Sequence, residues 1–157
     1  MRTTAGECKI YKRQNTIEVD EAVGRPPRGI RNRNPGNIRK TADRWKGLSA
    51  QQWDPAFFIF ETPLWGIRAM AAILRNYQMR NGVKSLAQIV GRWAPTEEND
   101  AAGYAAAVAK GMGIDPRRHL DLQDRSTLRA LIAAIIRHEN GPQPYDVETI
   151  DMAIDLV

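Results

Sequence analysis

The sequence predicts a mainly helical α+β domain, and three observations lead to that fold class. Several segments carry helix start and stop signals around apolar positions spaced three and four residues apart. A turn-rich segment, residues 28–61, precedes them and contains one short strand candidate, Phe57 to Phe60. The chain has 157 residues, which is enough for one domain with a substantial core. We therefore expect a helical body joined to a small β- and turn-rich subdomain.

Composition limits the classes of function that the chain can have. Apolar residues make up 43% and charged residues 26%, which is ordinary for a globular protein. The net charge of +5 and the sequence pI near 9.7 favour a polyanionic partner, and nucleic acid, anionic lipid and cell-wall polymers all qualify. The single cysteine, Cys8, excludes an internal disulfide framework and a cysteine-rich metal site.

The first 27 residues differ from the rest and are expected to form an N-terminal arm or linker before a domain at 28–157. They are polar, carry mixed charge and end in Gly24-Arg25-Pro26-Pro27. They contain no apolar segment typical of a secretory signal, and the chain has no apolar run long enough for a membrane span. A target outside the cytoplasm would therefore require delivery by another system.

Turn signals dominate the segment that follows. In Asn34-Pro35-Gly36-Asn37, proline fixes its own φ and glycine is expected to supply a positive φ. Asp54-Pro55 marks a second turn, and Phe57 to Phe60 then predicts a strand of a small antiparallel sheet. We expect Trp45 and Trp53 to pack over this sheet.

The helices are predicted from caps and breakers. Thr62 and Pro63 start the first, and Gly82 ends it. The others are expected from Ser85 to Trp93, from Thr96 or Asn99 to near Gly111, from Ser126 to Gly141, and after an Asp146 cap with an apolar face of Val147, Ile150, Ile154 and Val157.

Glu139 is the leading candidate for chemistry. It lies eleven positions after Leu128 in the helix predicted from Ser126 to Gly141, so it returns to the apolar face of that helix. Burial and the negative end of the helix dipole would both raise the pKa of its carboxyl group, as a general acid requires. Periodicity alone leaves two interpretations open. Glu139 is either a solvated helix-end acid paired with Arg137 or a general acid in a cleft.

Other acidic groups have a structural interpretation beside the functional one. Glu97, Glu98 and Asp100 cluster at a helix start, where the helix dipole favours acids and Asn99 or Asp100 serves as the cap. Asp54 in its turn would usually bond the backbone, but it becomes the second carboxylate of a glycosidase pair if it faces Glu139.

The basic and histidine residues give weaker signals. A run of cations indicates either a solvated face or a phosphate-contacting surface, but no helix-turn-helix, zinc-finger or RNP pattern accompanies it. His119 and His138 lack paired ligand spacing, so we predict no metal and no cofactor. The cations of the run are Arg28, Arg31, Arg33, Arg39, Lys40, Arg44 and Lys46.

A set of motifs resembles a known family. The motifs are RGIRNRNPGNIR, WKGL, FFIFETPLWGIRAMAAIL, WAPTEEND with Tyr104, and IIRHENGPQPY, between Arg28 and Tyr145. Together they resemble a family of bacteriophage virion proteins and related bacterial sequences, described as structural proteins with a lysozyme-like or lytic transglycosylase-like domain.

Two motifs add detail to this resemblance. IIRHENGPQPY looks like the helix-end acid of lytic transglycosylases, which implies Glu139 as general acid/base. The turn-rich part precedes this acid here and follows it in those enzymes, which implies a circularly permuted lysozyme-like domain. WAPTEEND with Tyr104 resembles the muramidase motif whose tyrosine helps to hold the glycan. The sequence departs from the pattern at Trp93, where tyrosine is commoner and sugar stacking would change, and at Arg33, which replaces a third asparagine.

The resemblance implies a peptidoglycan-cleaving muramidase that acts on the β-1,4 bond between N-acetylmuramic acid and N-acetylglucosamine. Glu139 would be the acid/base, and Asp54 or Glu98 would supply further negative charge. The reaction would be hydrolysis, as in a lysozyme, or 1,6-anhydro formation, as in a transglycosylase. Contacts to glycan strands are expected from Asn34, Asn37, Trp53, Tyr104, Asn140 and Tyr145.

Two alternatives come from other functional classes. One is a non-catalytic structural or wall-binding virion component, and the other is a nucleic-acid-binding module that uses the basic run. A muramidase without a secretory signal would reach the periplasm or cell wall in a virion, through a holin-type lesion or by a secretion system.

Overall fold

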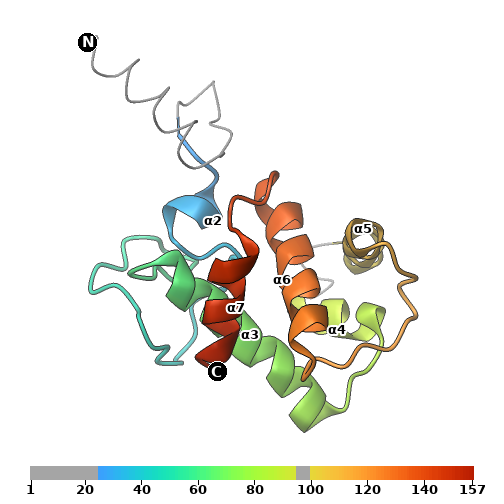
Figure 1. The fold of residues 1–157 in the computed structure, drawn as a ribbon. Helices are drawn as coiled ribbons and strands as arrows, with labels where there is room; N and C mark the ends of the chain where they lie inside the picture. Colours follow the sequence, from blue (N-terminus) through green and yellow to red (C-terminus); the bar gives the residue numbers. More distant parts are fainter. Residues whose placement is uncertain (1–24, 95–99) are drawn as a thin grey trace.

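The structure is a computed structural model that describes residues 25–94 and 100–157. Most of the described chain is helical, which confirms the predicted mainly helical character (Figure 1). The proposed arm at 1–27 lies almost entirely outside the described residues, as do Glu97, Glu98 and Asn99. The described helices are α2 (Arg28–Arg31), α3 (Pro63–Asn81), α4 (Leu86–Trp93), α5 (Ala101–Met112), α6 (Arg125–Asn140) and α7 (Val147–Asp155).

Local sequence sets most of the helix ends. The backbone N–H of Gln88 donates to the Ser85 hydroxyl oxygen, and the backbone N–H of Ser85 donates to the side-chain oxygen of Gln88. These two bonds form a capping box at the start of α4. Asp100 and Asp146 cap α5 and α7 through their side chains. Helix α3 begins at its predicted proline and ends at Gly82, whose φ of 64° is left-handed.

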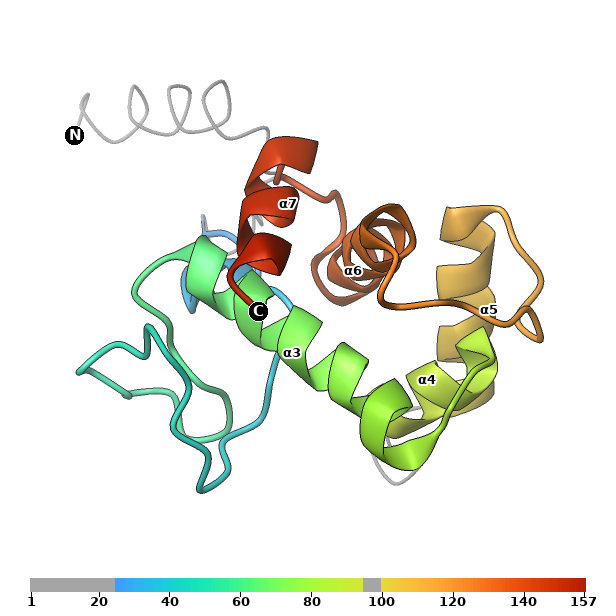
Figure 2. The same cartoon turned by 60° about the horizontal axis from the view of Figure 1, so that its bottom comes forward.

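Helix α6 lies at the centre of the molecule. It packs against α2, α3, α5 and α7, while α3 also contacts α4 and α7. Figures 1 and 2 show α6 between α7 on one side and α5 on the other, with the long α3 running beneath them. The end of α6 that carries Glu139 is therefore held by elements from both halves of the chain.

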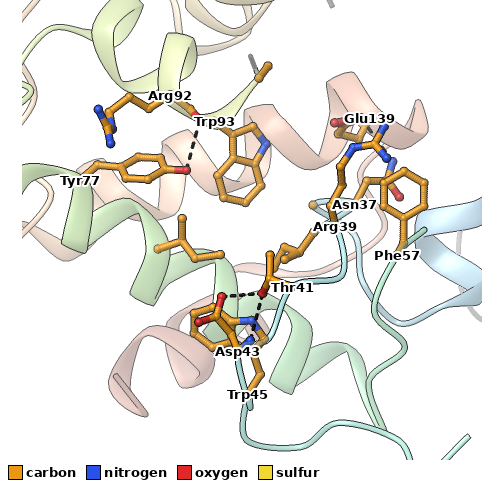
Figure 3. Close-up of a pocket in the computed structure, with 14 residues that line it drawn as sticks. Asn37, Arg39, Thr41, Asp43, Trp45, Phe57, Tyr77, Arg92, Trp93 and Glu139 are labelled. Atoms are coloured by element: carbon orange, nitrogen blue, oxygen red, sulfur yellow. Dashed lines mark hydrogen bonds between the residues drawn. The ribbon is translucent and has the colours of Figure 1, made fainter. Parts of the chain in front are cut away.

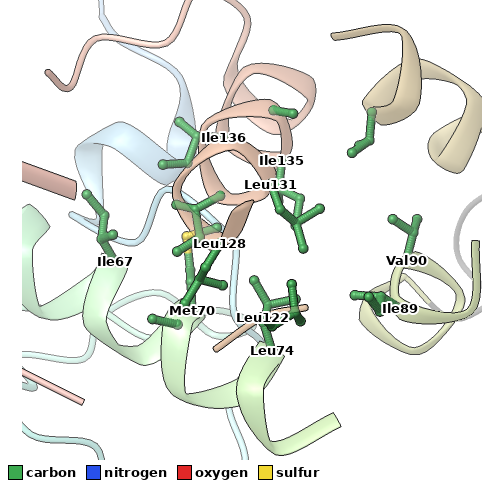
Figure 4. Packing of buried hydrophobic residues seen from close by; sticks show 14 of the residues in the cluster. Ile67, Met70, Leu74, Ile89, Val90, Leu122, Leu128, Leu131, Ile135 and Ile136 are labelled. Atoms are coloured by element: carbon green, nitrogen blue, oxygen red, sulfur yellow. The ribbon is translucent and has the colours of Figure 1, made fainter. Parts of the chain in front are cut away.

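The core confirms the predicted apolar face of α6, whose inward side chains meet those of α3 and α4 (Figure 4). No helix in the described ranges is long and apolar enough to cross a membrane. The predicted face of α7 is correct only at Ile150 and Ile154, because Val147 at its start and Val157 beyond its end are exposed. The buried centre of the core includes Ile67, Met70, Leu74, Ile89, Val90, Leu122, Leu128, Leu131, Ile132, Ile135 and Ile136.

The expected antiparallel sheet is reduced to isolated bridges in the described chain. Arg39 bridges Phe57, and Leu48 bridges Phe60, both in antiparallel orientation. The segment between α2 and α3 instead forms a long irregular loop beside the first turns of α3 (Figure 2). The strand prediction over Phe57 to Phe60 therefore identified residues that pair, but no continuous ladder forms.

The turn at residues 34–37 is present, but glycine has a different role from the expected one. Asn37, not Gly36, has the positive φ, at 49°, and asparagine is among the few residues that tolerate this region. A Cβ on Gly36 would lie 2.8 Å from the Trp93 ring and 2.9 Å from the Met70 sulfur. Gly36 is therefore needed for the close approach of the turn to α3 and α4.

Candidate active site

Glu139 lies in the last turn of α6, where two side chains from distant parts of the chain hold its carboxyl group. The Asn37 amide nitrogen donates to Glu139 Oε2 at 3.3 Å, and the Tyr104 hydroxyl bonds Oε1 at 3.3 Å. Asn37 comes from the turn after α2, and Tyr104 comes from the buried face of α5. Three separate segments thus meet at one half-buried acid.

Burial raises the pKa of the Glu139 carboxyl group above its ordinary value. The bond from Asn37, the charge of His138, the bond from Tyr104 and the charge of Arg39 act in the opposite direction. The pKa of Tyr104 is also raised, chiefly by burial and then by the charge of Glu139, so its hydroxyl stays protonated and can donate. The protonated form of Glu139 is thereby favoured, which a general acid needs.

Glu139 opens onto a cavity of about 480 Å³ between the turn-rich segment and helices α3 and α4 (Figure 3). Aromatic side chains form much of its wall, and charged groups stand at separate points around it. Its volume is within the range of small-molecule sites. The lining includes Asn37, Arg39, Thr41, Asp43, Trp45, Phe57, Tyr77, Arg92, Trp93 and Glu139.

Asp43 is the other acidic residue of this lining, and the sequence interpretation overlooked it. The Thr41 hydroxyl donates to Asp43 Oδ2 at 2.6 Å, and the Asp43 amide donates to that hydroxyl at 3.2 Å. Figure 3 shows Asp43 and Glu139 on different sides of the cavity. The cavity therefore presents one half-buried acid and one solvated carboxylate.

Asp54, the expected second carboxylate, does not line this cavity. Its buried carboxylate receives Nε and a terminal nitrogen of Arg28 at 2.7 and 2.6 Å, and the Asn32 amide at 2.8 Å. It also accepts the backbone amides of Ala56 and Phe57. The Arg28 guanidinium, above all, holds the pKa of Asp54 well below its usual range. Its oxygens are occupied in this way, so Asp54 organises the turn-rich segment, and a catalytic role for it stays a prediction.

Two of the expected substrate-binding asparagines are buried and hydrogen-bonded within the protein. Asn34 is fully buried, and its amide donates to the carbonyls of Ile38 and Phe58. Asn140 is buried as well and donates to the Pro35 carbonyl at 2.7 Å, which ties the turn to the end of α6. Neither lines the cavity, so both position the residues that do.

The remaining predicted site residues are divided among several places. Trp53 is 60% exposed and lies outside the cavity lining, and Tyr145 packs against the core instead. Tyr104 contacts Glu139 directly, and its ring lies against that of His138, with centroids 3.9 Å apart and the ring planes tilted by 45°. Glu98 is outside the described residues.

Part of the basic run is engaged within the protein. Arg28 pairs with Asp54, the Arg33 Nε donates to the Phe60 carbonyl, and the Lys40 ammonium donates to the Gln52 carbonyl. No group of three or more histidine, cysteine or acidic side chains in the described ranges could hold a metal ion.

Comparison with known proteins gives one informative relation. Over 136 residues the chain is 43% identical to Protein P5 of Pseudoalteromonas phage PM2, and the match covers 85% of this chain and 81% of that protein. The chain belongs to the P5 family. No protein-family model matches it. Membership in the P5 family confirms the predicted relation to a bacteriophage protein.

This P5 family member has cavity residues that sequence patterns could not identify. Asp43 stands within the basic run and beside Thr41, a pairing that predicts only a local turn. Arg92 looks like an ordinary basic residue in the last turn of a helix. Only the three-dimensional fold places them on one cavity with Glu139.

Proposed function

We propose that this protein is a phage-encoded muramidase that cleaves the β-1,4 bond between N-acetylmuramic acid and N-acetylglucosamine. The observation that supports this best is Glu139, a half-buried acid of raised pKa on a cavity, held by Asn37 and Tyr104. Burial favours the protonated form of such an acid, and that form can donate a proton. The domain would be of the lysozyme-like type implied by the sequence motifs.

In this proposal Glu139 enters the reaction protonated and donates to the leaving glycosidic oxygen. As the C1–O bond breaks, the oxygen of water or of the muramyl 6-hydroxyl bonds to C1 and its proton passes to the Glu139 carboxylate, which gives hydrolysis or a 1,6-anhydro product. Asn37 and Tyr104 hold both carboxyl oxygens in place during the exchange. General acid–base catalysis of this kind accelerates a reaction by roughly 10²–10⁴-fold.

Asp43 takes the role that the sequence had suggested for Asp54. Glycosidases pair a carboxylic acid with a carboxylate, and because Glu139 is the base here, the carboxylate would stabilise the oxocarbenium-like transition state. Asp43 lies on the same cavity as Glu139, and the Thr41 hydroxyl fixes one of its oxygens. The aromatic rings of Trp45, Phe57 and Trp93 supply apolar walls against which sugar faces can pack.

The experiment is digestion of purified peptidoglycan by the purified protein. Wild type should reduce turbidity, and Glu139→Gln should lower the rate by at least about 10²-fold because it cannot donate the proton. Asp43→Asn should also be impaired, whereas Glu148→Gln, an exposed acid on α7, should match wild type. Mass analysis of the products identifies hydrolysis or 1,6-anhydro formation. Digestion that survives Glu139→Gln contradicts the proposed mechanism.

A second candidate is a non-catalytic structural component of the phage particle, and membership in the P5 family favours it. In that case the bonds from Asn37 and Tyr104 would only satisfy a half-buried carboxyl group. This candidate predicts that wild type leaves peptidoglycan intact while the protein is recovered with purified particles. Peptidoglycan cleavage that depends on Glu139 would reject it.

A further inference from the structure

Arg92 stands on the cavity at the end of α4, away from Glu139 (Figure 3). Its guanidinium lies over the Tyr77 ring, 5.5 Å from the centroid, and the Tyr77 hydroxyl donates to the Arg92 carbonyl at 3.3 Å. Tyr77 comes from α3, so contacts between two helices set the position of this exposed cation. Stacking on an aromatic face orients a guanidinium and leaves its edge free for other bonds.

The guanidinium of Arg92 has no carboxylate partner among the described residues. By contrast, Arg28, Arg117, Arg125 and Arg129 each form an ion pair with an aspartate. Arg92 therefore combines a fixed position on the cavity with an edge that the described part of the chain does not occupy. A planar guanidinium of this kind matches the two oxygens of a carboxylate.

We infer that Arg92 binds a carboxylate carried on the muramyl sugar, so that the cavity selects an acidic glycan over a neutral one. The identity of the sugar rests on the proposed function, but the anion preference rests on Arg92, Tyr77 and the cavity. Two groups on the muramyl sugar could supply this carboxylate. One is the free lactyl group, and the other is a carboxylate of the attached stem peptide.

The chemistry of the cavity supports a division of roles along its length. Glu139 and Asp43 would act on the glycosidic bond, whereas Arg92 would hold a group that takes no part in bond cleavage. Binding energy from such a remote group positions the reacting bond. A neutral glycan of N-acetylglucosamine would lack this contact and would bind in more than one register.

Binding is measured by calorimetry in a Glu139→Gln background, so that the ligand stays intact. The probes are a peptide-free muramyl tetrasaccharide with its lactyl carboxylates, the same glycan with stem peptides, and neutral chitotetraose. Arg92→Gln should weaken binding of at least one acidic glycan about tenfold and leave chitotetraose unchanged. The acidic glycan that is affected identifies the source of the carboxylate.

Two further variants make the comparison specific. Arg92→Lys keeps the charge and should restore part of the affinity for the acidic glycan. Arg80→Gln removes an equal charge from an exposed position outside the cavity lining and should behave as the background protein does. Circular dichroism checks that each variant is folded.

The outcomes separate this inference from the proposed function. Equal losses for acidic and neutral glycans, no loss for either, or no binding of any glycan would overturn the role of Arg92. A selective loss supports that role whether or not wild type cleaves peptidoglycan. Cleavage by the protein with its native Glu139 is a separate measurement, and its absence would remove the muramidase and leave the acidic-glycan preference standing.

Discussion

At the residue scale, Glu139 experiences opposing effects on one carboxyl group. Burial raises its pKa, whereas donation from Asn37 and Tyr104 and the nearby charges of His138 and Arg39 favour the ionised form. Burial prevails, so the folded state holds the proton more tightly than the unfolded state does. This feature links the proposed chemistry to the stability of the protein.

The pH dependence of stability follows from that direction. At pH values between 4.5 and the raised pKa of Glu139, the folded state binds more protons than the unfolded state, so the contribution of Glu139 falls as pH rises through this window. At pH 7 the wild type therefore carries a cost that Glu139→Gln removes. We expect Glu139→Gln to be more stable there by roughly 0.5–2 kcal/mol, the usual size of a stabilising substitution.

Urea unfolding at pH 7 and at pH 4 measures this effect. The advantage of Glu139→Gln over wild type should shrink at pH 4, where both states of wild type bind the proton. Glu61→Gln, at an exposed carboxylate, is the matched control. An advantage of the same size at both pH values would show that lost or gained contacts, and not ionisation, set the difference.

The residue scale also shows which part of the site sequence patterns could predict. The position of Glu139 follows from helical periodicity, because an acid on the apolar face of α6 has to be at least partly buried. Its partner Asn37 lies 102 positions away, and no local pattern encodes that contact. Asp54 and Asp43 both form short-range hydrogen bonds with residues two or three positions away, so local sequence does not distinguish them. Only the Arg28 and Asn32 contacts reveal that Asp54 is structural.

At the element scale, the sequence predicts the helices after residue 62 because their signals are local, but it does not predict α2. Caps such as Ser85 and stops such as Gly82 act within one turn of the residues that they terminate. The predicted sheet does not form because side chains, in place of a neighbouring strand, satisfy backbone groups in the turn-rich segment. For example, the side-chain nitrogen of Gln52 donates to the Ile59 carbonyl, and the side-chain oxygen of Gln52 accepts from the Ile59 backbone N–H, as a neighbouring strand would.

The short helix α2 illustrates a constraint that is visible only in three dimensions. A Cβ on Gly29 would lie 2.4 Å from Asn140 Oδ1 and 2.8 Å from Asn37 Oδ1. Gly29→Ala should therefore separate α2 from the end of α6 and destabilise the protein by about 1–3 kcal/mol. Thermal unfolding gives the stability, and glycan binding reports the displacement of Asn37 from Glu139.

Gly91→Ala in α4 is the matched control, because a Cβ there meets nothing within 4 Å. Alanine has the higher helix propensity, so this variant should be neutral or more stable by up to about 1 kcal/mol. If Gly29→Ala is as stable as Gly91→Ala, the junction between α2 and α6 can relax, and its tight packing is not required.

At the scale of the whole molecule, α6 contributes both to the hydrophobic core and, through Glu139, to the cavity. Its first turns complete the apolar interior with α3, and its last turn receives the turn-rich segment through Asn140 and Glu139. The cavity therefore forms only when segments from both halves of the chain are folded together. The end of α6 is consequently shared by the core and the cavity.

Net charge is the other property of the whole molecule, and it leads to a prediction about rate. The chain carries +5, and the proposed substrate is an anionic polymer, so attraction should speed encounter at low salt. The Debye length falls from about 30 Å at 0.01 M to about 8 Å at 0.15 M ionic strength, which screens that attraction. The initial rate of peptidoglycan digestion should therefore fall several-fold across this range, while the affinity for neutral chitotetraose stays level. A parallel fall in both measurements would mean that salt acts on the protein itself and that long-range attraction plays no part in its encounter with the wall.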